Sequence, residues 1–186
     1  MNDEHRNALA KALADNPRAL MWFHMGRCLR SQLQSPPAAA VAANVLLSPS
    51  SSAEDRFDAV RILQMTLGDV GPAQDRATMF DSYAPAMSLA SIEREMNPIL
   101  SKVAAIFPSG DANLDHELIR LIAMTTPFNR DLFGRLLSGI TDNTLPSDDI
   151  HRLAAISQFQ IERSYEESVA TAKALLGIDV KIRKLG

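Results

Sequence analysis

The fold is decided between Phe107 and Gly177, where residues 113–125 read NLDHELIRLIAMT and residues 129–140 read NRDLFGRLLSGI. In the first segment the apolar side chains recur every three or four residues, at Leu114, Leu118, Leu121 and Ile122. This spacing places them on one face of an α-helix, and the second segment has the same spacing. Because only a few residues separate the segments, we expect two helices packed as an antiparallel pair.

The same arrangement recurs in residues 147–157, SDDIHRLAAIS, and residues 164–177, SYEESVATAKALLG. The predicted helix ends are an Asn113 cap, a Ser147 cap, a capping box from Ser164 to Glu167, and a stop at Gly177. The predicted buried positions of the second pair are Ile150, Leu153, Ala154, Ser157, Tyr165, Val169, Ala172 and Leu176. Leu114 and Ile150 lie about 36 positions apart, a spacing typical of helical repeats.

The rest of the chain also reads as helices separated by proline and glycine. Helices are expected over residues 3–14, 18–33, 37–47, 53–67, 73–80 and 91–107. A capping box at Ser51–Glu54 opens the fourth of these, with Phe57 among its buried residues, and Gly68 ends it. The apolar 18–33 segment is expected to be surrounded on several sides, and Pro98 either kinks the last helix or starts a new one.

These patterns predict an all-α protein of nine or ten helices. The expected architecture for residues 1–186 is a single domain of antiparallel helical hairpins stacked as a short HEAT-like α-solenoid. A compact helical bundle is the alternative. No segment shows the period-two alternation of a strand.

Composition argues against several classes of function. The formal net charge of −3 disfavours a general nucleic-acid binder, and the basic residues 181–184 fit a helix C-terminus. Cys28 is the single cysteine, so no intrachain disulfide can form, and its apolar surroundings favour a buried structural thiol. No apolar run reaches the length of a membrane span, and the first residues do not resemble a signal peptide.

Two acidic clusters with a histidine raise the possibility of metal binding: Asp111, Asp115, His116 and Glu117, and then Asp148, Asp149 and His151. Acidic residues at a helix start are expected from the helix dipole alone, so we interpret both clusters as structural. No phosphate-binding loop or nucleophile elbow is present. The sequence therefore predicts no catalytic, cofactor-binding or metal-binding residue, and no cofactor.

Three stretches carry a family resemblance: residues 107–121 (FPSGDANLDHELIRL), residues 61–64 (RILQ), and residues 149–151 (DIH) with Arg163-Ser164 downstream. They resemble HEAT-type helical-repeat regions of large bacterial proteins that also carry a propeller-type dehydrogenase-like module and a haem-binding module. The resemblance covers about residues 54–184. It implies a scaffold without chemistry of its own, since the haem and propeller motifs are absent from this chain.

The leading hypothesis is therefore a non-enzymatic scaffold or protein-interaction module, whose partner is another protein or a neighbouring domain. A HEAT-like enzyme acting on nucleic acid, such as an alkylation-damage DNA glycosylase, is the alternative, and a metal-dependent hydrolase using Asp111, Asp115 and His116 is a third. A complete chain would be cytoplasmic, whereas a segment of the resembling larger proteins would be exported.

Overall fold

The computed structural model describes residues 3–31, 33–69, 83–125 and 129–185. These residues form nine helices and no strand: α1 (Asp3–Ala12), α2 (Pro17–Ser31), α3 (Pro36–Leu47), α4 (Ala53–Thr66), α5 (Glu93–Ala105), α6 (Ala112–Thr125), α7 (Arg130–Ser138), α8 (Pro146–Ser157) and α9 (Tyr165–Leu185). The predicted all-α fold is confirmed for this part of the chain. The helix predicted over residues 73–80 lies outside the described residues.

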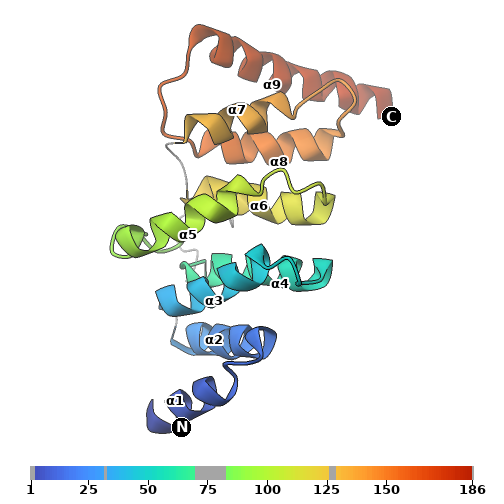
Figure 1. The fold of residues 1–186 in the computed structure, drawn as a ribbon. Coiled ribbons are helices and arrows are strands. Elements are labelled where there is room, and N and C mark those ends of the chain that lie inside the picture. The colour runs from blue at the N-terminus through green and yellow to red at the C-terminus, as the bar shows by residue number, and fades with distance from the viewer. Residues whose placement is uncertain (1–2, 32, 70–82, 126–128, 186) are drawn as a thin grey trace.

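The helices follow one another in layers from the N-terminal end to the C-terminal end of the molecule (Figure 1). α3 and α4 form one helical pair, and α2 packs on both of them. The next layer consists of α5 and α6. The α7–α8 pair and then α9 complete the series, and α4, α6 and α8 contact one another in sequence through the layers. This arrangement is compatible with a short solenoid of stacked helical pairs.

The predicted pairing of the 113–125 helix with the 129–140 helix is wrong in detail. α7 packs mainly on α8, while α6 packs on α4, α8 and α5. A short link only brings the ends of two helices close, and the apolar stripe then selects the partner. Here the stripe of α7 places Phe133 against Phe159, whose ring lies edge-on at 5.7 Å.

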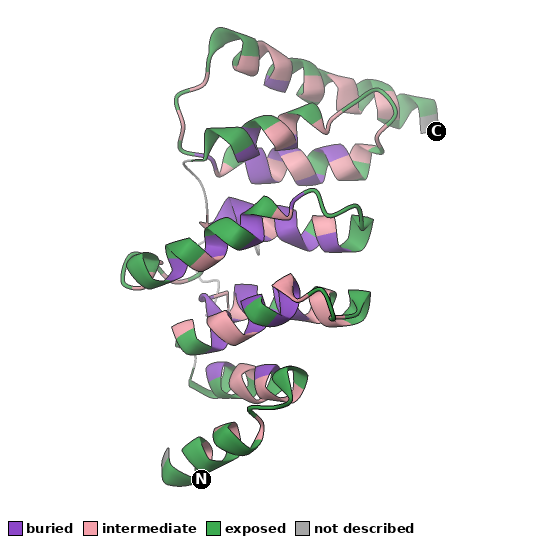
Figure 2. Cartoon of the chain, viewed as in Figure 1, coloured by how far each residue is buried: buried purple, intermediate pink, exposed green. Residues whose placement is uncertain are grey.

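The core lies in the middle layers, from α3 to α8 (Figure 2). α3 contributes four alanines without exposed surface, Ala38, Ala39, Ala42 and Ala43, so its backbone can lie close to its neighbours. α6 is buried on several sides, with eight of its residues in the interior. Leu118 in α6 and Phe133 in α7 have no exposed surface, as their apolar stripes predict.

The expectation that the 18–33 helix is surrounded is wrong. Only Met21 and Cys28 of α2 are buried, whereas Trp22 is 41 % exposed and Leu29 is 45 % exposed. α2 packs on α3 and α4, and Trp22 and Leu29 lie outside these contacts. Phe57 in α4, also expected in the core, is 38 % exposed.

The buried faces of α8 and α9 also differ from the predicted ones. In α8 the buried residues are Asp149, His151, Leu153, Ala155 and Ile156, and Ile150 and Ser157 are exposed. In α9 the side turned inward carries Thr171, Ala174 and Ile178, while Tyr165, Ala172 and Leu176 are exposed and Val169 is half-buried. The prediction assumed that the apolar residues of each helix decide which face is buried, but polar pairs decide it here.

Most predicted helix starts are confirmed within a residue or two, and several caps shift. Ser52, not Ser51, caps α4, and its hydroxyl accepts from the Asp55 N–H at 3.1 Å. Asp111 caps α6 in place of Asn113, and Leu145, not Ser147, precedes α8 without a side-chain cap. In α4 and α6 the shift replaces one capping residue by a neighbour whose side-chain oxygen reaches the free N–H groups of the first turn.

Three residues that can break helices behave differently from one another. Gly68 ends α4 as predicted, with φ of 119°, and a Cβ there would lie 3.0 Å from Gln34 and from Met87. Gly177 does not end a helix, because α9 continues to Leu185. α5 runs through Pro98, so of the two predicted alternatives the start of a new helix at this proline is wrong.

No helix in the described ranges combines the length and the apolar character that crossing a membrane requires.

A core deletion tests the layer assignment. Leu118→Ala should lower the free energy of unfolding by about 2–5 kcal/mol, because the site is fully buried and a cavity remains. The matched control, Leu176→Ala in α9, removes a side chain that is 73 % exposed and should cost under about 0.5 kcal/mol. Urea unfolding followed by circular dichroism measures both, and a loss below about 1 kcal/mol for Leu118→Ala would contradict the assignment.

Candidate functional site

In the first acidic cluster, Asp111 and Asp115 hold the loop at the start of α6, whereas Glu117 is packed inside the protein. Asp111 accepts hydrogen bonds from the N–H groups of Asn113 and Leu114 at 2.9 and 3.2 Å. Asp115 accepts from the N–H and the hydroxyl of Ser109, both at 2.7 Å. These two carboxylates therefore hold the loop before α6, which agrees with the capping interpretation of the sequence.

Glu117 has a different role, because it is buried between α4 and α6 with 6 % exposure. Its carboxylate accepts from Arg61 at 3.0 Å, Gln64 at 3.2 Å and Arg120 at 2.8 Å. The Gln64 side chain also donates to the Glu117 carbonyl at 2.9 Å. A buried carboxylate is tolerated only when it is paired and hydrogen-bonded, so this cluster joins the two helices and leaves Glu117 little capacity for a substrate.

His151 lies in a second buried junction, between α8, α6 and the segment before α5. Its Nε2 lies 2.9 Å from the His116 carbonyl, and its Nδ1 contacts the Tyr83 hydroxyl. A carbonyl can only accept, so Nε2 carries the proton and Nδ1 accepts from Tyr83. Burial raises the pKa of Tyr83, which keeps the phenol neutral and able to donate.

The environment of His151 favours its neutral form. Burial and the neighbouring His116, whose ring stacks on it at 4.2 Å, lower the pKa of His151 to about 4. His116 in turn contacts the Asp148 carboxylate at 3.3 Å. A recess of about 260 Å³ borders both rings. His151 uses both of its nitrogens in contacts between helices, so we assign it a structural role.

The second acidic cluster also contains a buried ion pair that the sequence did not reveal. Asp149 in α8 has no exposed surface and pairs with Lys181 of α9, whose side chain is 12 % exposed. Thr144 donates to the same carboxylate at 2.5 Å, and Lys181 also donates to Thr144 at 3.0 Å. The basic residues 181–184 lie at the C-terminal end of α9, as predicted, and Lys181 in addition fixes α9 on α8.

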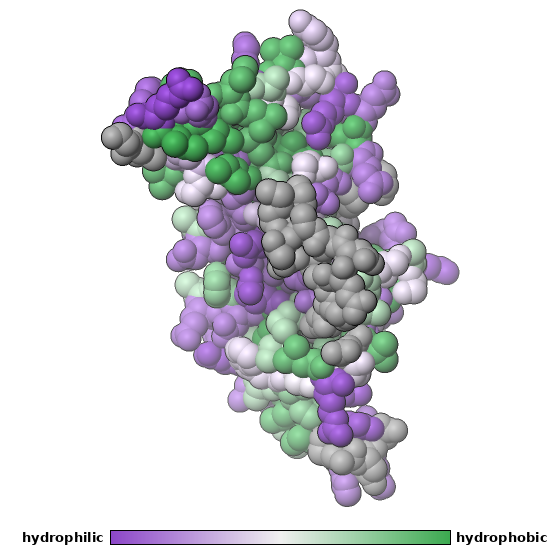
Figure 3. Space-filling view, turned by 180° about the vertical axis from the view of Figure 1, so that it is seen from behind, coloured by the Kyte–Doolittle hydropathy of each residue, from purple (hydrophilic) through white to green (hydrophobic). Residues whose placement is uncertain are grey.

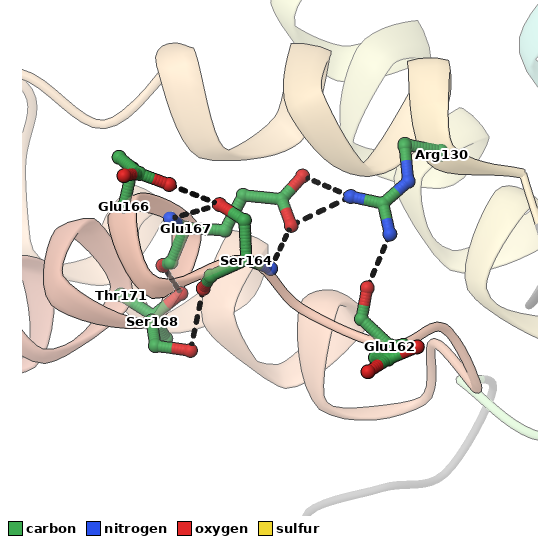
Figure 4. Close-up of polar contacts among 7 residues, drawn as sticks. All are labelled: Arg130, Glu162, Ser164, Glu166, Glu167, Ser168 and Thr171. Carbon is green, nitrogen blue, oxygen red and sulfur yellow. Dashed lines mark hydrogen bonds and ion pairs between the residues drawn. The ribbon is translucent and has the colours of Figure 1, made fainter.

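The start of α9 is held by the predicted capping box and by one arginine (Figure 4). The Ser164 N–H donates to Glu167 at 2.7 Å, and the Glu167 N–H donates to the Ser164 hydroxyl at 3.1 Å. Arg130 of α7 donates from Nη1 to both oxygens of Glu167 at 2.7 Å and from Nη2 to the Glu162 carbonyl. The Ser164 N–H and then Arg130 hold the pKa of Glu167 below its usual value.

The remaining reactive groups lie in α2. Cys28 is 2 % exposed, and burial raises the pKa of its thiol, so the predicted buried structural thiol is confirmed. His24 is half-buried, and burial together with Arg27 lowers its pKa. Within the ranges that the structure describes, no group of three or more His, Cys, Asp or Glu side chains is placed to hold a metal ion.

These groups therefore serve mainly to connect helices, and the candidate functional site is a surface. The outer face of α9 exposes Leu175, Leu176, Val180 and Ile182, each between 51 and 73 %. Apolar atoms gather at the end of the molecule that α9 forms (Figure 3). We call this set of four residues the α9 outer face. The sequence missed this set because the predicted stripe of this helix shared only Leu176 with it and was expected to be buried.

No protein-family model, curated protein or solved structure matches this chain.

The lowered pKa of His151 makes the free energy of unfolding depend on pH in a predictable direction. The unfolded chain binds a proton on His151 near pH 6.5, whereas the native chain does so only near pH 4. The free energy of unfolding should therefore fall as pH decreases through this window, by about 2 kcal/mol between pH 7 and pH 5. Urea unfolding at both pH values should show this loss in the native sequence.

His151→Gln is the variant that isolates this contribution, because glutamine can still donate to the His116 carbonyl but does not titrate. It should remove most of the difference between pH 7 and pH 5. His24→Gln is measured beside it, since the lowered pKa of His24 acts in the same direction. An unchanged pH dependence in His151→Gln would show that the neutral His151 junction is wrong.

The buried ion pair between α8 and α9 can be compared with an exposed ion pair within α9. Asp149→Ala leaves the Lys181 ammonium in a buried position without its carboxylate and should cost about 3–5 kcal/mol of unfolding free energy. Asp179→Ala removes a pair with Arg183 whose side chains are 63 and 77 % exposed, and should cost under about 1 kcal/mol. Equal losses in thermal and urea unfolding would contradict the assigned role of Asp149.

Proposed function

We propose that this chain is a non-enzymatic helical scaffold, or protein-interaction module, that packs against another protein or a neighbouring domain. The observation that carries the proposal is the α9 outer face, with Leu176 73 % exposed and Leu175 55 % exposed. Single exposed apolar residues are ordinary on a protein surface, but four of them between residues 175 and 182 of one helix favour an interaction site.

The position of this face in the fold strengthens the argument. A stack of helical layers needs a polar outer face on its last helix, because that helix has a neighbour on one side only. α9 contacts α8 with the side that carries Thr171, Ala174 and Ile178, while the four aliphatic residues of the α9 outer face stay exposed around the rest of the helix. Covering them should contribute about 1 kcal/mol or more for each side chain.

α9 is also held firmly enough to present a fixed surface. Its start is fixed by Arg130 and the Ser164–Glu167 capping box, and a later turn is fixed by the Asp149–Lys181 pair. Contacts at two separated points restrict rotation of the helix about its own axis. A partner would therefore meet a preorganised apolar face, which lowers the entropic cost of binding.

The layered helix pairs and the family resemblance together support the more specific proposal of a HEAT-like repeat region. Arg61, Gln64, Glu117 and His151, which lie in the resembling stretches, are the residues that connect α4, α6 and α8. In a larger protein such a region would hold neighbouring modules at a fixed separation. The partner would then be another domain of the same polypeptide.

Site-specific photo-crosslinking in the source cells tests the proposal. A photoreactive residue in place of Leu176 should give one defined protein adduct, or an internal cross-link to a neighbouring domain. Arg94, an exposed residue of α5, is the control position and should give no such product. The proposal would be wrong if positions 175, 176 and 180 gave no adduct in protein that circular dichroism shows to be folded.

A further inference from the structure

The side of α2 that faces away from the core borders a recess of about 740 Å³. Trp22, Phe23, Gly26, Arg27, Arg30 and Leu33 are among its lining residues. The recess lies near the N-terminal end of the stack, whereas α9 forms the opposite end (Figure 1). It is thus a second surface, separate from the α9 outer face.

The recess is positively charged in a chain whose formal net charge is −3. None of its described lining residues is aspartate or glutamate. Arg27 and Arg30 are exposed, and neither forms an ion pair with a carboxylate of the described residues. Arg18 in the same helix contrasts with them, because it pairs with Asp55 at 2.9 Å and with Asp58 at 3.6 Å.

Apolar side chains lie beside the two arginines. Trp22 is 41 % exposed and Leu33 is 59 % exposed. The Arg27 guanidinium lies 6.0 Å from the centre of the Phe23 ring, which restrains the arginine while its N–H groups remain available. Exposed tryptophan and arginine side chains are the residue types that most often dominate protein–protein binding energy.

Gly26 lies at the recess and has no evident role in the packing of the chain. A Cβ at this position would meet no described atom within 4 Å. Glycine inside a helix is less stable than alanine, so folding alone favours a larger residue here. A bare helix backbone does, however, allow another molecule to approach α2 closely.

We infer that this recess binds an acidic, amphipathic peptide segment of a partner protein, with its carboxylates on Arg27 and Arg30 and an apolar side chain between Trp22 and Leu33. Arginine forms bidentate hydrogen bonds with carboxylates, and Trp22 and Leu33 offer apolar area for the anchor. This inference rests on the proposed function in treating the chain as a protein-binding module, but it concerns a different face.

The charges favour a peptide over a nucleic acid. Proteins that bind single-stranded nucleic acid follow its backbone with an extended basic groove and stack successive bases on aromatic rings. The recess holds three arginines, two aromatic rings and an aliphatic residue, Leu33, in one confined place and not along an extended groove. A short segment with a few carboxylates and one apolar anchor matches this pattern better than a run of phosphates.

Selection from a phage-displayed library of random peptides of about a dozen residues tests the inference. The native protein is the target, and the double variant Arg27→Glu/Arg30→Glu is used for counter-selection. We expect the recovered peptides to combine aspartate or glutamate with leucine, phenylalanine or tryptophan. Synthetic versions, measured by fluorescence polarisation, should bind the double variant about tenfold more weakly or worse.

Two further variants test whether the peptides bind at the α2 recess and not elsewhere on the surface. Arg94→Glu/Lys102→Glu changes the net charge equally on α5, where both residues are exposed, and should bind as the native protein does. Gly26→Leu places a side chain in the recess and should abolish binding without lowering the urea midpoint, since a Cβ at this position meets no described atom within 4 Å.

Three outcomes would overturn the inference: no peptide survives counter-selection, the surviving peptides lack carboxylates, or a labelled single-stranded oligonucleotide binds as tightly as the peptides. None of these affects the cross-link expected at Leu176. Failure of the α2 inference and failure of the proposed function can therefore be told apart.

Discussion

The structure depends first on the burial of one carboxylate. Glu117 lies inside α6 at the contact with α4, and an unpaired charge there would cost several kcal/mol. Arg61 and Gln64 from α4 and Arg120 from α6 satisfy it together. Only one register of α4 against α6 brings these donors to the carboxylate, whereas apolar side chains alone would allow several. The charged cluster therefore fixes how two adjacent layers align.

The same principle recurs toward the C-terminus with other residues. His151 connects α8 to the carbonyl of His116 in α6, and Asp149, two positions earlier, connects α8 to Lys181 in α9. Two residues of α8 on either side of Ile150 thus join α8 to α6 and to α9. Their burial rotates α8 so that Ile150 is exposed. Specific polar contacts orient the last helices, and aliphatic surface is left outside as a consequence.

The sequence predicted the positions of the helices well, but it predicted less well which face of each helix is buried. The Ser164–Glu167 capping box and the stop at Gly68 depend on nearby residues, so local patterns predict them. The buried sides of α8 and α9 depend on partners 32 or more positions away, such as Lys181 for Asp149. The candidate surface sites were missed for the same reason, because an exposed apolar stripe and a buried one have the same spacing in sequence.

The two ends of the stack differ in a way that bears on function. Any stack of layers leaves one face of each terminal helix without a neighbour, and polar residues usually cover it. α9 presents aliphatic residues there, whereas near the other end α2, which α1 precedes, presents arginines and aromatic rings. One partner surface cannot complement both, because the first requires an apolar face and the second requires carboxylates. If both proposals hold, the chain stands between two different neighbours, and the polar clusters of α4, α6 and α8 keep the two surfaces at a fixed separation.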